Sequence, residues 1–123
     1  MKFVLLHGPA WQAGDLAAAL DADDVERKAI TALGPGSLDE RPTVLLLDET
    51  LRRLLGPAGT RDAADAGATV VALGAPGETD IPDDLPGADV VAAFLTHPAG
   101  RRQLLTALRN ACHEAAARIE FGR

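Results

Sequence analysis

Four short apolar runs recur along the chain, and each is continuous rather than alternating with polar residues. They are Phe3–Leu6, Val44–Leu47, Thr69–Leu73 and Val90–Leu95, and Gly, Pro or charged residues flank them. Continuous apolar runs predict strands that are buried on both faces, which is typical of a parallel sheet between two layers of helices. A fifth run, Val25–Thr31, carries three charged residues in succession and is predicted to be an edge strand.

The segments between these runs have helical patterns. A helix is predicted over Ala10–Leu20, where apolar residues share one face, and another over Glu49–Leu55, which the following Gly-Pro pair should end. A further short helix is expected over Thr60–Ala66, with its first residue as the N-cap. The longest helix is predicted over Ala99–Ile119, because Leu and Ala recur there at the three-to-four spacing of a buried stripe.

Two connections lack a helical pattern. Gly34–Gly36 interrupts the connection after the second strand, and the acidic, proline-broken segment Gly77–Gly87 follows the fourth. The second and fourth helices are therefore expected to be short or missing. The sequence contains neither an internal repeat nor an interdomain linker. Residues 1–123 are thus expected to form one α/β domain with right-handed crossovers.

Composition excludes several classes of function. The 123 residues carry a formal net charge of −6 and only 3% aromatic residues, so neither basic charge nor stacking rings favour nucleic-acid binding. The apolar runs are too short to span a bilayer and the N-terminus lacks a signal-peptide pattern, so we expect no membrane partner and a cytoplasmic location. The single cysteine, Cys112, excludes an internal disulfide and falls on the apolar stripe of the last helix, where a buried side chain is expected.

Several motifs, taken in order, resemble a known family. Val44–Asp48 is an apolar strand ending in aspartate, Gly87–Asp89 reads Gly-Ala-Asp, and Phe94–Pro98 reads Phe-Leu-Thr-His-Pro before an amphipathic helix. Their order and spacing resemble the receiver domain of bacterial two-component response regulators nearly from end to end. The resemblance implies a flavodoxin-like three-layer sandwich with five parallel strands in the order 2-1-3-4-5.

The functional positions of the receiver family match this chain poorly. The resemblance places the phosphoacceptor at Asp48, but the acidic pair that holds Mg²⁺ in receivers falls on His7 and Gly8. The hydroxyl after the fourth strand falls on Gly74, and the lysine before the proline falls on His97. Phosphoryl transfer to a carboxylate needs a cation between the two negative groups. The sequence therefore predicts a degenerate pseudo-receiver that is not an enzyme and that holds no metal or other cofactor.

Three interpretations of the strand ends stay open. Asp48 can be the N-cap of the helix that begins at Glu49, or it can be a genuine phosphoacceptor in a phosphorelay. A third interpretation is a metal or small-molecule sensor at the carboxyl edge of the sheet. In that case His7, His97 and Asp48 would supply two imidazoles and a carboxylate.

The leading functional prediction is a signalling module that acts through protein contact. Receivers meet their partners through the fourth helix, fifth strand and fifth helix, and the candidate interface residues there are Phe94, Arg101, Arg102, Leu105 and Arg109. Opposite charges on adjoining elements favour a homodimer with two-fold symmetry. A second kind of protein partner would be an output domain such as a kinase or cyclase, if the chain is the N-terminal module of a longer signalling protein.

Overall fold

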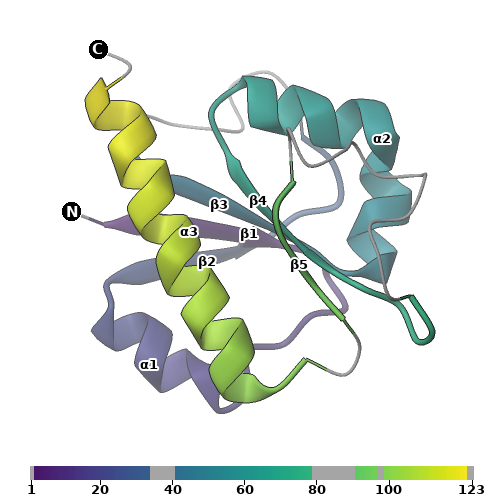
Figure 1. The fold of residues 1–123 in the computed structure, drawn as a ribbon, viewed down its shortest axis with the longest axis horizontal. Coiled ribbons are helices and arrows are strands. Elements are labelled where there is room, and N and C mark those ends of the chain that lie inside the picture. The colour runs from purple at the N-terminus through teal and green to yellow at the C-terminus, as the bar shows by residue number, and fades with distance from the viewer. Residues whose placement is uncertain (1, 34–40, 79–90, 97–98, 122–123) are drawn as a thin grey trace.

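The fold is built on a parallel sheet. A computed structural model describes residues 2–33, 41–78, 91–96 and 99–121. In these residues five parallel strands form one sheet in the order β2-β1-β3-β4-β5 (Figure 1). The strands are β1 (Phe3–His7), β2 (Val25–Ala29), β3 (Thr43–Leu47), β4 (Thr69–Leu73) and β5 (Val91–Leu95). The predicted flavodoxin-like order and the edge position of the second strand are confirmed.

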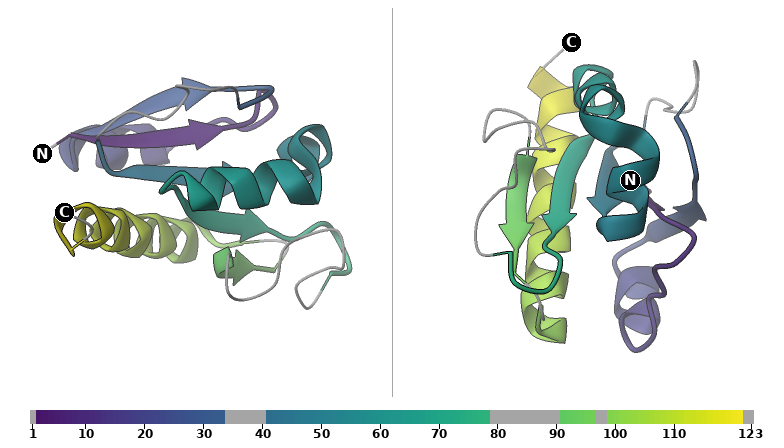
Figure 2. Two further views of the ribbon diagram at one scale, coloured as in Figure 1. Left: turned by 90° about the horizontal axis from the view of Figure 1, so that it is seen from above. Right: turned by 90° about the vertical axis from the view of Figure 1, so that its right-hand side faces the viewer.

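Three helices cover the sheet in the described residues: α1 (Leu16–Ala22), α2 (Glu49–Asp65) and α3 (Arg101–Phe121). The buried side chains of α1 and α3 belong to one core cluster, and those of α2 belong to another. The right-hand view of Figure 2 shows α2 and α3 on opposite sides of the sheet. The three-layer sandwich is therefore confirmed. Among the described residues, no helix is long and apolar enough to cross a bilayer.

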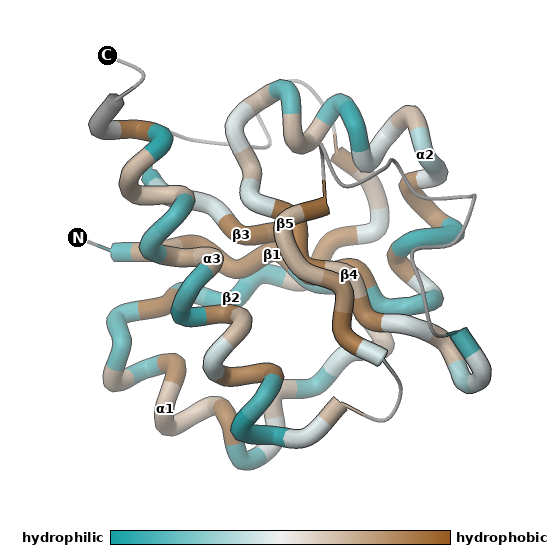
Figure 3. Tube along the Cα trace, viewed as in Figure 1, coloured by the Kyte–Doolittle hydropathy of each residue, from teal (hydrophilic) through white to brown (hydrophobic). Residues whose placement is uncertain are grey.

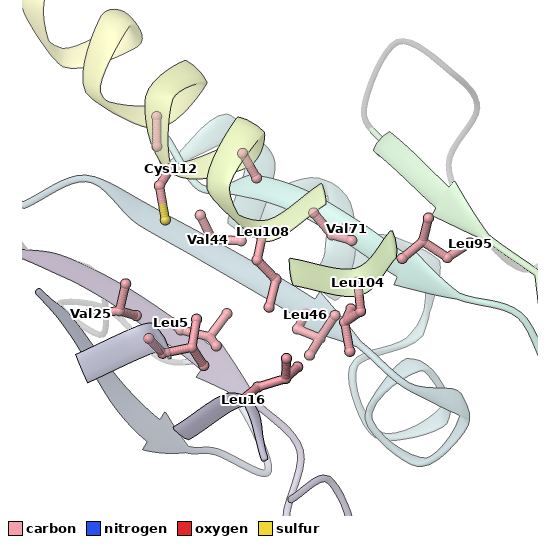
Figure 4. Close-up of a cluster of buried hydrophobic side chains, with 13 residues drawn as sticks. Leu5, Leu16, Val25, Val44, Leu46, Val71, Leu95, Leu104, Leu108 and Cys112 are labelled. Atoms are coloured by element: carbon pink, nitrogen blue, oxygen red, sulfur yellow. The ribbon is translucent and has the colours of Figure 1, made fainter. Parts of the chain in front are cut away.

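The two cores follow from the alternation of side chains along buried strands. In β3, Val44 and Leu46 point toward α1 and α3, whereas Leu45 and Leu47 point toward α2, and all four are fully buried. Figure 3 shows the resulting apolar strands beside helices whose hydropathy alternates. In Figure 4, Leu108 of α3 lies over the β3 side chains of this face. Continuous apolar runs were thus a reliable signal for strands buried on both faces.

The first helix differs from its prediction, because it begins at Leu16 rather than Ala10 and ends at Ala22. The preceding residues form turns instead: the amide of Trp11 donates to the carbonyl of Gly8 (3.3 Å), and that of Leu16 to Ala13 (2.9 Å). Gly14 adopts a φ of +54°, a left-handed conformation that a continuous helix does not contain.

The helix after β3 combines two predicted helices across a kink. Gly56 has a φ of 69° and a ψ of 175°, so the helical geometry breaks there as predicted. The second segment resumes at Pro57, whose fixed φ suits the first turn of a helix. Thr60 is therefore not an N-cap, which corrects the prediction. Its fully buried hydroxyl instead donates to the carbonyl of Gly56 at 2.9 Å.

The connections after β2 and β4 have no helix in their described parts, residues 30–33 and 74–78. The remaining parts, together with the Gly-Ala-Asp motif and His97, lie outside the described residues. The last helix begins at Arg101, two residues later than predicted, and its stripe is confirmed. Cys112 is buried in the core cluster of α1 and α3 as expected, and this burial, together with the charge of Asp23, raises the pKa of its thiol to about 11.

Candidate functional site

The carboxyl ends of the parallel strands meet at one edge of the sheet. β1 ends at His7, Asp48 directly follows β3, and Gly74 directly follows β4. Because the chain leaves β1 toward one face and β3 toward the other, this edge is where open α/β sheets form ligand crevices. The structure thus brings His7, Gly8, Asp48 and Gly74 to one edge, whereas His97 lies outside the described residues.

Asp48 is the N-cap of α2. Its backbone is extended, with a φ of −85° and a ψ of 177°, and its Oδ1 accepts a hydrogen bond from the amide of Leu51 at 2.8 Å. This bond satisfies one of the amides that a helix leaves without a partner in its first turn. The N-cap interpretation of Asp48 is confirmed, since one of its two carboxylate oxygens accepts the amide of the first helical turn.

Neighbouring side chains pack closely against Gly8, which leaves little room for a side chain at this position. A Cβ atom at this position would lie 3.0 Å from Cβ of Leu51 and 3.1 Å from Oδ1 of Asp48. The first distance is shorter than nine in ten contacts of Cβ atoms in folded proteins, and Leu51 is itself fully buried. Gly8 therefore lies directly against the first turn of α2 and against the Asp48 carboxylate.

Gly74, at the end of β4, is also closely packed, in this case against residues of β5. A Cβ atom here would lie 3.0 Å from Cζ of Phe94 and 3.3 Å from the carbonyl oxygen of Leu95. The amide of Gly74 donates to that carbonyl at 2.7 Å, which holds the strand end against β5. Phe94 thus occupies the space that a hydroxyl-bearing side chain at position 74 would need.

His7 is half-buried and interacts with the loop that follows it. Its Nδ1 lies 2.8 Å from the carbonyl oxygen of Gly8, and its ring centroid lies 5.0 Å from that of Trp11 with the planes tilted by 55°. Trp11 also packs against the core cluster of α1 and α3. Trp11 therefore lies beside the end of β1, and the imidazole of His7 is held by ordinary packing.

The donor set at this edge does not fit the Mg²⁺ ion that a receiver fold implies. Among the described residues, no three His, Cys, Asp or Glu side chains lie together as a metal site requires. Mg²⁺ demands near-octahedral oxygen ligands, whereas this edge offers one carboxylate already engaged by Leu51 and no side chain at Gly8. The predicted set of His7, Asp48 and His97 includes a residue outside the described part of the chain.

A charged pair that the sequence did not reveal lies between α2 and the loop after β4. The guanidinium of Arg52 is 7% exposed and binds the Glu78 carboxylate in a bidentate manner, with N–O distances of 2.9 and 3.3 Å. Oε1 of Glu78 also accepts the amide of Ala75 at 2.6 Å. The two residues are 26 positions apart, and the sequence shows Glu78 only as part of the acidic, proline-broken segment Gly77–Gly87. No local pattern pairs them, so only the tertiary structure shows the contact.

We expect the Arg52–Glu78 pair to give the protein a stability that depends on pH. The guanidinium of Arg52, and secondarily the amide of Ala75, lower the pKa of Glu78 below its ordinary value of 4.5. A lowered pKa means that the carboxylate stabilises the fold above pH 4.5 and that this contribution disappears as the pH falls further. Glu78→Gln should therefore reduce the melting temperature at pH 7, and the deficit should shrink below pH 4.5 in melts followed by circular dichroism.

A matched control uses the other glutamate that pairs with an arginine of α2. Glu49 contacts Arg53 at 2.6 Å, but the arginine is 74% exposed, so Glu49→Gln should change the melting temperature little at any pH. A Glu78→Gln deficit of the same size at pH 3 and pH 7 would show that packing rather than charge produces it.

The five predicted interface residues lie on different faces. Arg101 binds Asp15 at 2.9 Å and Arg109 binds Asp23 at 2.6 Å, so both arginines are engaged with the ends of α1 in the same chain. These contacts place Asp15 and Asp23, at the two ends of α1, opposite the two arginines.

The remaining three interface candidates are also separated. Phe94 packs with the α2 core, whereas Leu105 packs with the core of α1 and α3 on the opposite face. Arg102 is exposed on α3. Phe94 and Leu105 therefore pack on opposite faces of the sheet, and Arg102 differs in its contacts from the two arginines that α1 engages.

Comparisons with known proteins identify the fold but no sequence family. No family model matches the chain, and no curated protein matches it. The chain is similar to the solved structure of the response regulator StyR, with a TM-score of 0.66 and 17% identity over 98% of this chain and 64% of that one. It is similar at 16% identity to a CheY-like receiver domain protein from Methanospirillum hungatei JF-1, with a TM-score of 0.60 over 95% of this chain and 98% of that one.

A third similar structure is much longer than this chain. NtrX from Brucella abortus matches with a TM-score of 0.59 and 16% identity over 99% of this chain but only 29% of its own length. The chain therefore spans less than two thirds of StyR and of NtrX, and nearly all of the M. hungatei protein. What the similar structures share with it along nearly its whole length is the architecture of five parallel strands between helices. The chain has the fold of a response-regulator receiver domain.

Proposed function

We propose that this chain is a receiver-like module of two-component signalling that acts through protein contact, without Mg²⁺-dependent phosphorylation of Asp48. One observation carries the proposal: the Asp48 carboxylate caps its own helix, and Gly8, which lies beside it against the first turn of that helix, supplies no ligand. Leu51 binds the carboxylate through its amide and approaches Gly8 through its Cβ. The resemblance to receivers places the cation between this carboxylate and an acidic pair, and in this chain His7 and Gly8 stand at the positions of that pair.

The chemistry of phosphoryl transfer supports this reading of the packing. An incoming phosphoryl group and a carboxylate repel one another unless a cation lies between them. The positions that would supply further carboxylates are His7 and Gly8, and the position that would supply a hydroxyl is Gly74. Each departs from the receiver pattern, and both glycines lie against neighbouring side chains. A module with these residues has a scaffold for contact but lacks the groups of a phosphorylation switch.

The similar structures support a protein as the partner. StyR and NtrX each contain chain beyond the part that matches here, so in those proteins a receiver-like fold is joined to further polypeptide. Within our proposal the partner is therefore either an output domain or a separate signalling protein.

The proposal predicts that the chain is not phosphorylated by a small phosphodonor. Incubation with acetyl phosphate and Mg²⁺ should leave its intact mass unchanged, whereas a catalytically competent receiver treated in parallel should gain the mass of one phosphoryl group. Asp48→Asn is the matched control, because asparagine preserves the N-cap bond but cannot form an acyl phosphate. A phosphoryl adduct on the wild type that is absent from Asp48→Asn would overturn the proposal in favour of a genuine phosphoacceptor.

A further inference from the structure

We propose that the pocket between the carboxyl-terminal end of α1 and α3 binds a small apolar α-amino acid in its zwitterionic form. The pocket has a volume of about 320 Å³, at the lower end of the range of about 300–1,000 Å³ that is usual for ligand sites, so it suits a small molecule. It lies beside the first residues of β1 and β2, at the edge of the sheet opposite to the edge that holds Asp48. The inference goes beyond the proposed function and does not rest on it.

The interior of the pocket is apolar. Four hydrophobic side chains and one thiol line it: Phe3, Leu20, Val25, Leu108 and Cys112. All but Phe3 belong to the buried core, and Phe3 packs against that core. In Figure 4, the sulfur of Cys112 points from α3 toward the strands, on the side where Val25 lies. Such a lining favours an aliphatic or aromatic group, because the apolar surface of both is removed from water when the group enters.

Two opposite charges lie at the mouth of the pocket. Asp23, the C-cap of α1, and Arg109 of α3 both line it, and their side chains are 33% and 49% exposed. Nε of Arg109 lies 2.6 Å from Oδ2 of Asp23. The charge of Asp23 also acts on the interior, since burial and then this charge raise the pKa of Cys112 to about 11. The pocket therefore combines an apolar interior with a positive and a negative group side by side.

The contact between these two charges leaves groups with which a ligand can bond. It engages Nε of Arg109 and one oxygen of Asp23. Within the described residues, the two Nη groups of Arg109 and Oδ1 of Asp23 make no hydrogen bond. A guanidinium has five N–H donors, and a carboxylate accepts on both of its oxygens. A ligand can thus bind both side chains while the bond between them stays in place.

The paired charges determine the class of ligand. A simple carboxylate would be attracted by Arg109 but repelled by Asp23, and a simple amine would meet the reverse. A zwitterion satisfies both side chains. Because these side chains are in direct contact, the ammonium and carboxylate groups of the ligand must also be close together, as they are on the single α-carbon of an amino acid.

A third polar group supports the same orientation of the ligand. His113 follows Arg109 by one turn on α3, is exposed and also lines the pocket, so its imidazole can donate a further hydrogen bond to the carboxylate. With the ammonium at Asp23 and the carboxylate at Arg109 and His113, the side chain of the amino acid enters the apolar interior. Such a ligand would contact α1, β2 and α3 together.

The test is a titration of the full chain with L-leucine, followed by isothermal titration calorimetry at pH 7. Leucine should bind and should raise the melting temperature, since a ligand of the folded chain stabilises it. In two-dimensional NMR spectra, the amide signals of Val25 and Arg109 should shift. Glycine lacks the apolar side chain, N-acetyl-L-leucine lacks the ammonium group and 3-methylbutylamine lacks the carboxylate. Each of these three compounds should bind at least about tenfold more weakly than leucine.

Arg109→Gln and Asp23→Asn test the two charges of the pocket. Each should weaken the binding of leucine by about tenfold or more, because each leaves one charged group of the ligand without its counter-charge. The matched controls are Arg101→Gln and Asp15→Asn, which alter the other ion pair between the same two helices. Arg101 contacts Asp15 at 2.9 Å, but neither residue lines this pocket, so both controls should bind leucine like the wild type. Circular dichroism verifies that each variant is folded.

Three results would overturn the inference. The first is a wild type that does not bind leucine at millimolar concentrations, and the second is equal binding of leucine and of either singly charged analogue. The third is binding that persists in both Arg109→Gln and Asp23→Asn, which would place leucine elsewhere on the chain. These results are separate from those that test the proposed function. A chain that is phosphorylated on Asp48 can still bind leucine in this pocket, and a chain that resists acetyl phosphate can fail to bind it.

Discussion

Leu51→Ala is expected to lower the free energy of unfolding by about 2–5 kcal/mol, the range for truncation of a fully buried leucine. Leu51 is 0% exposed and belongs to the core between the sheet and α2, together with Leu6 and Leu47. Its removal leaves a cavity beneath the first turn of α2, and close packing on both sides limits how far the surroundings can collapse. Urea denaturation followed by circular dichroism measures the change, and an unchanged m-value would confirm that the variant unfolds as one unit.

Leu54→Ala is the matched control on the same helix. Leu54 is 50% exposed, so its truncation should change the free energy of unfolding by no more than about 0.5 kcal/mol. The comparison separates burial from helix propensity, since both substitutions replace leucine with alanine in the same segment. Similar losses for the two variants would contradict the packing described for the first turn of α2.

The sequence predicted the strands better than the beginnings of the helices, and the reason is physical. A strand in a doubly covered parallel sheet needs apolar residues at every position, so Val44–Leu47 carries its own signal. The first residue of a helix depends on turns and caps. The apolar pattern of Ala10–Leu20 does not indicate the turn at Gly14. Because of this turn, α1 begins only at Leu16.

Some features of the candidate site could be predicted from the sequence, and others could not. Residues that follow strands could be located from the sequence, because parallel strands deliver their carboxyl ends to one edge. The N-cap role of Asp48 was also predictable, since it depends only on the amide of Leu51 three residues later. The contact between Arg52 and Glu78, and the packing of Phe94 over Gly74, depend on how separate elements meet. No local pattern encodes such distances, so these features required the structure.

The two glycines at the edge connect packing with function. At Gly8 and Gly74 the resemblance to receivers implies side chains with oxygen atoms, and in this chain neighbouring side chains approach to 3.0 Å of where each Cβ would be. Loss of the functional side chain and occupation of its space therefore go together. Restoring receiver chemistry would require Leu51 and Phe94 to move as well as new side chains to be introduced.

Gly8→Ala tests this closure directly and should lower the free energy of unfolding by about 1–3 kcal/mol, the usual cost of overpacking a close-packed region. The expected loss is steric, because Gly8 is not among the glycines with positive φ and its backbone would accept alanine. The added methyl group would press on Cβ of Leu51 and on Oδ1 of Asp48, so the N-cap bond should weaken too. Urea denaturation measures the stability, and amide hydrogen exchange at Leu51 reports the bond.

Gly100→Ala provides the control for the general effect of replacing glycine with alanine. In the described part of the chain, no atom beyond the adjoining residues lies within 4 Å of a Cβ built at Gly100, and its φ is not positive. The lower chain entropy of unfolded alanine opposes the preference for glycine over alanine where α3 begins, so the net change should stay within about 0.5 kcal/mol. If Gly8→Ala changed the free energy of unfolding as little as Gly100→Ala, Leu51 and Asp48 would have to move aside at little cost. The space beside the carboxylate would then be open to a ligand, which would remove the main support for a module that works without phosphorylation.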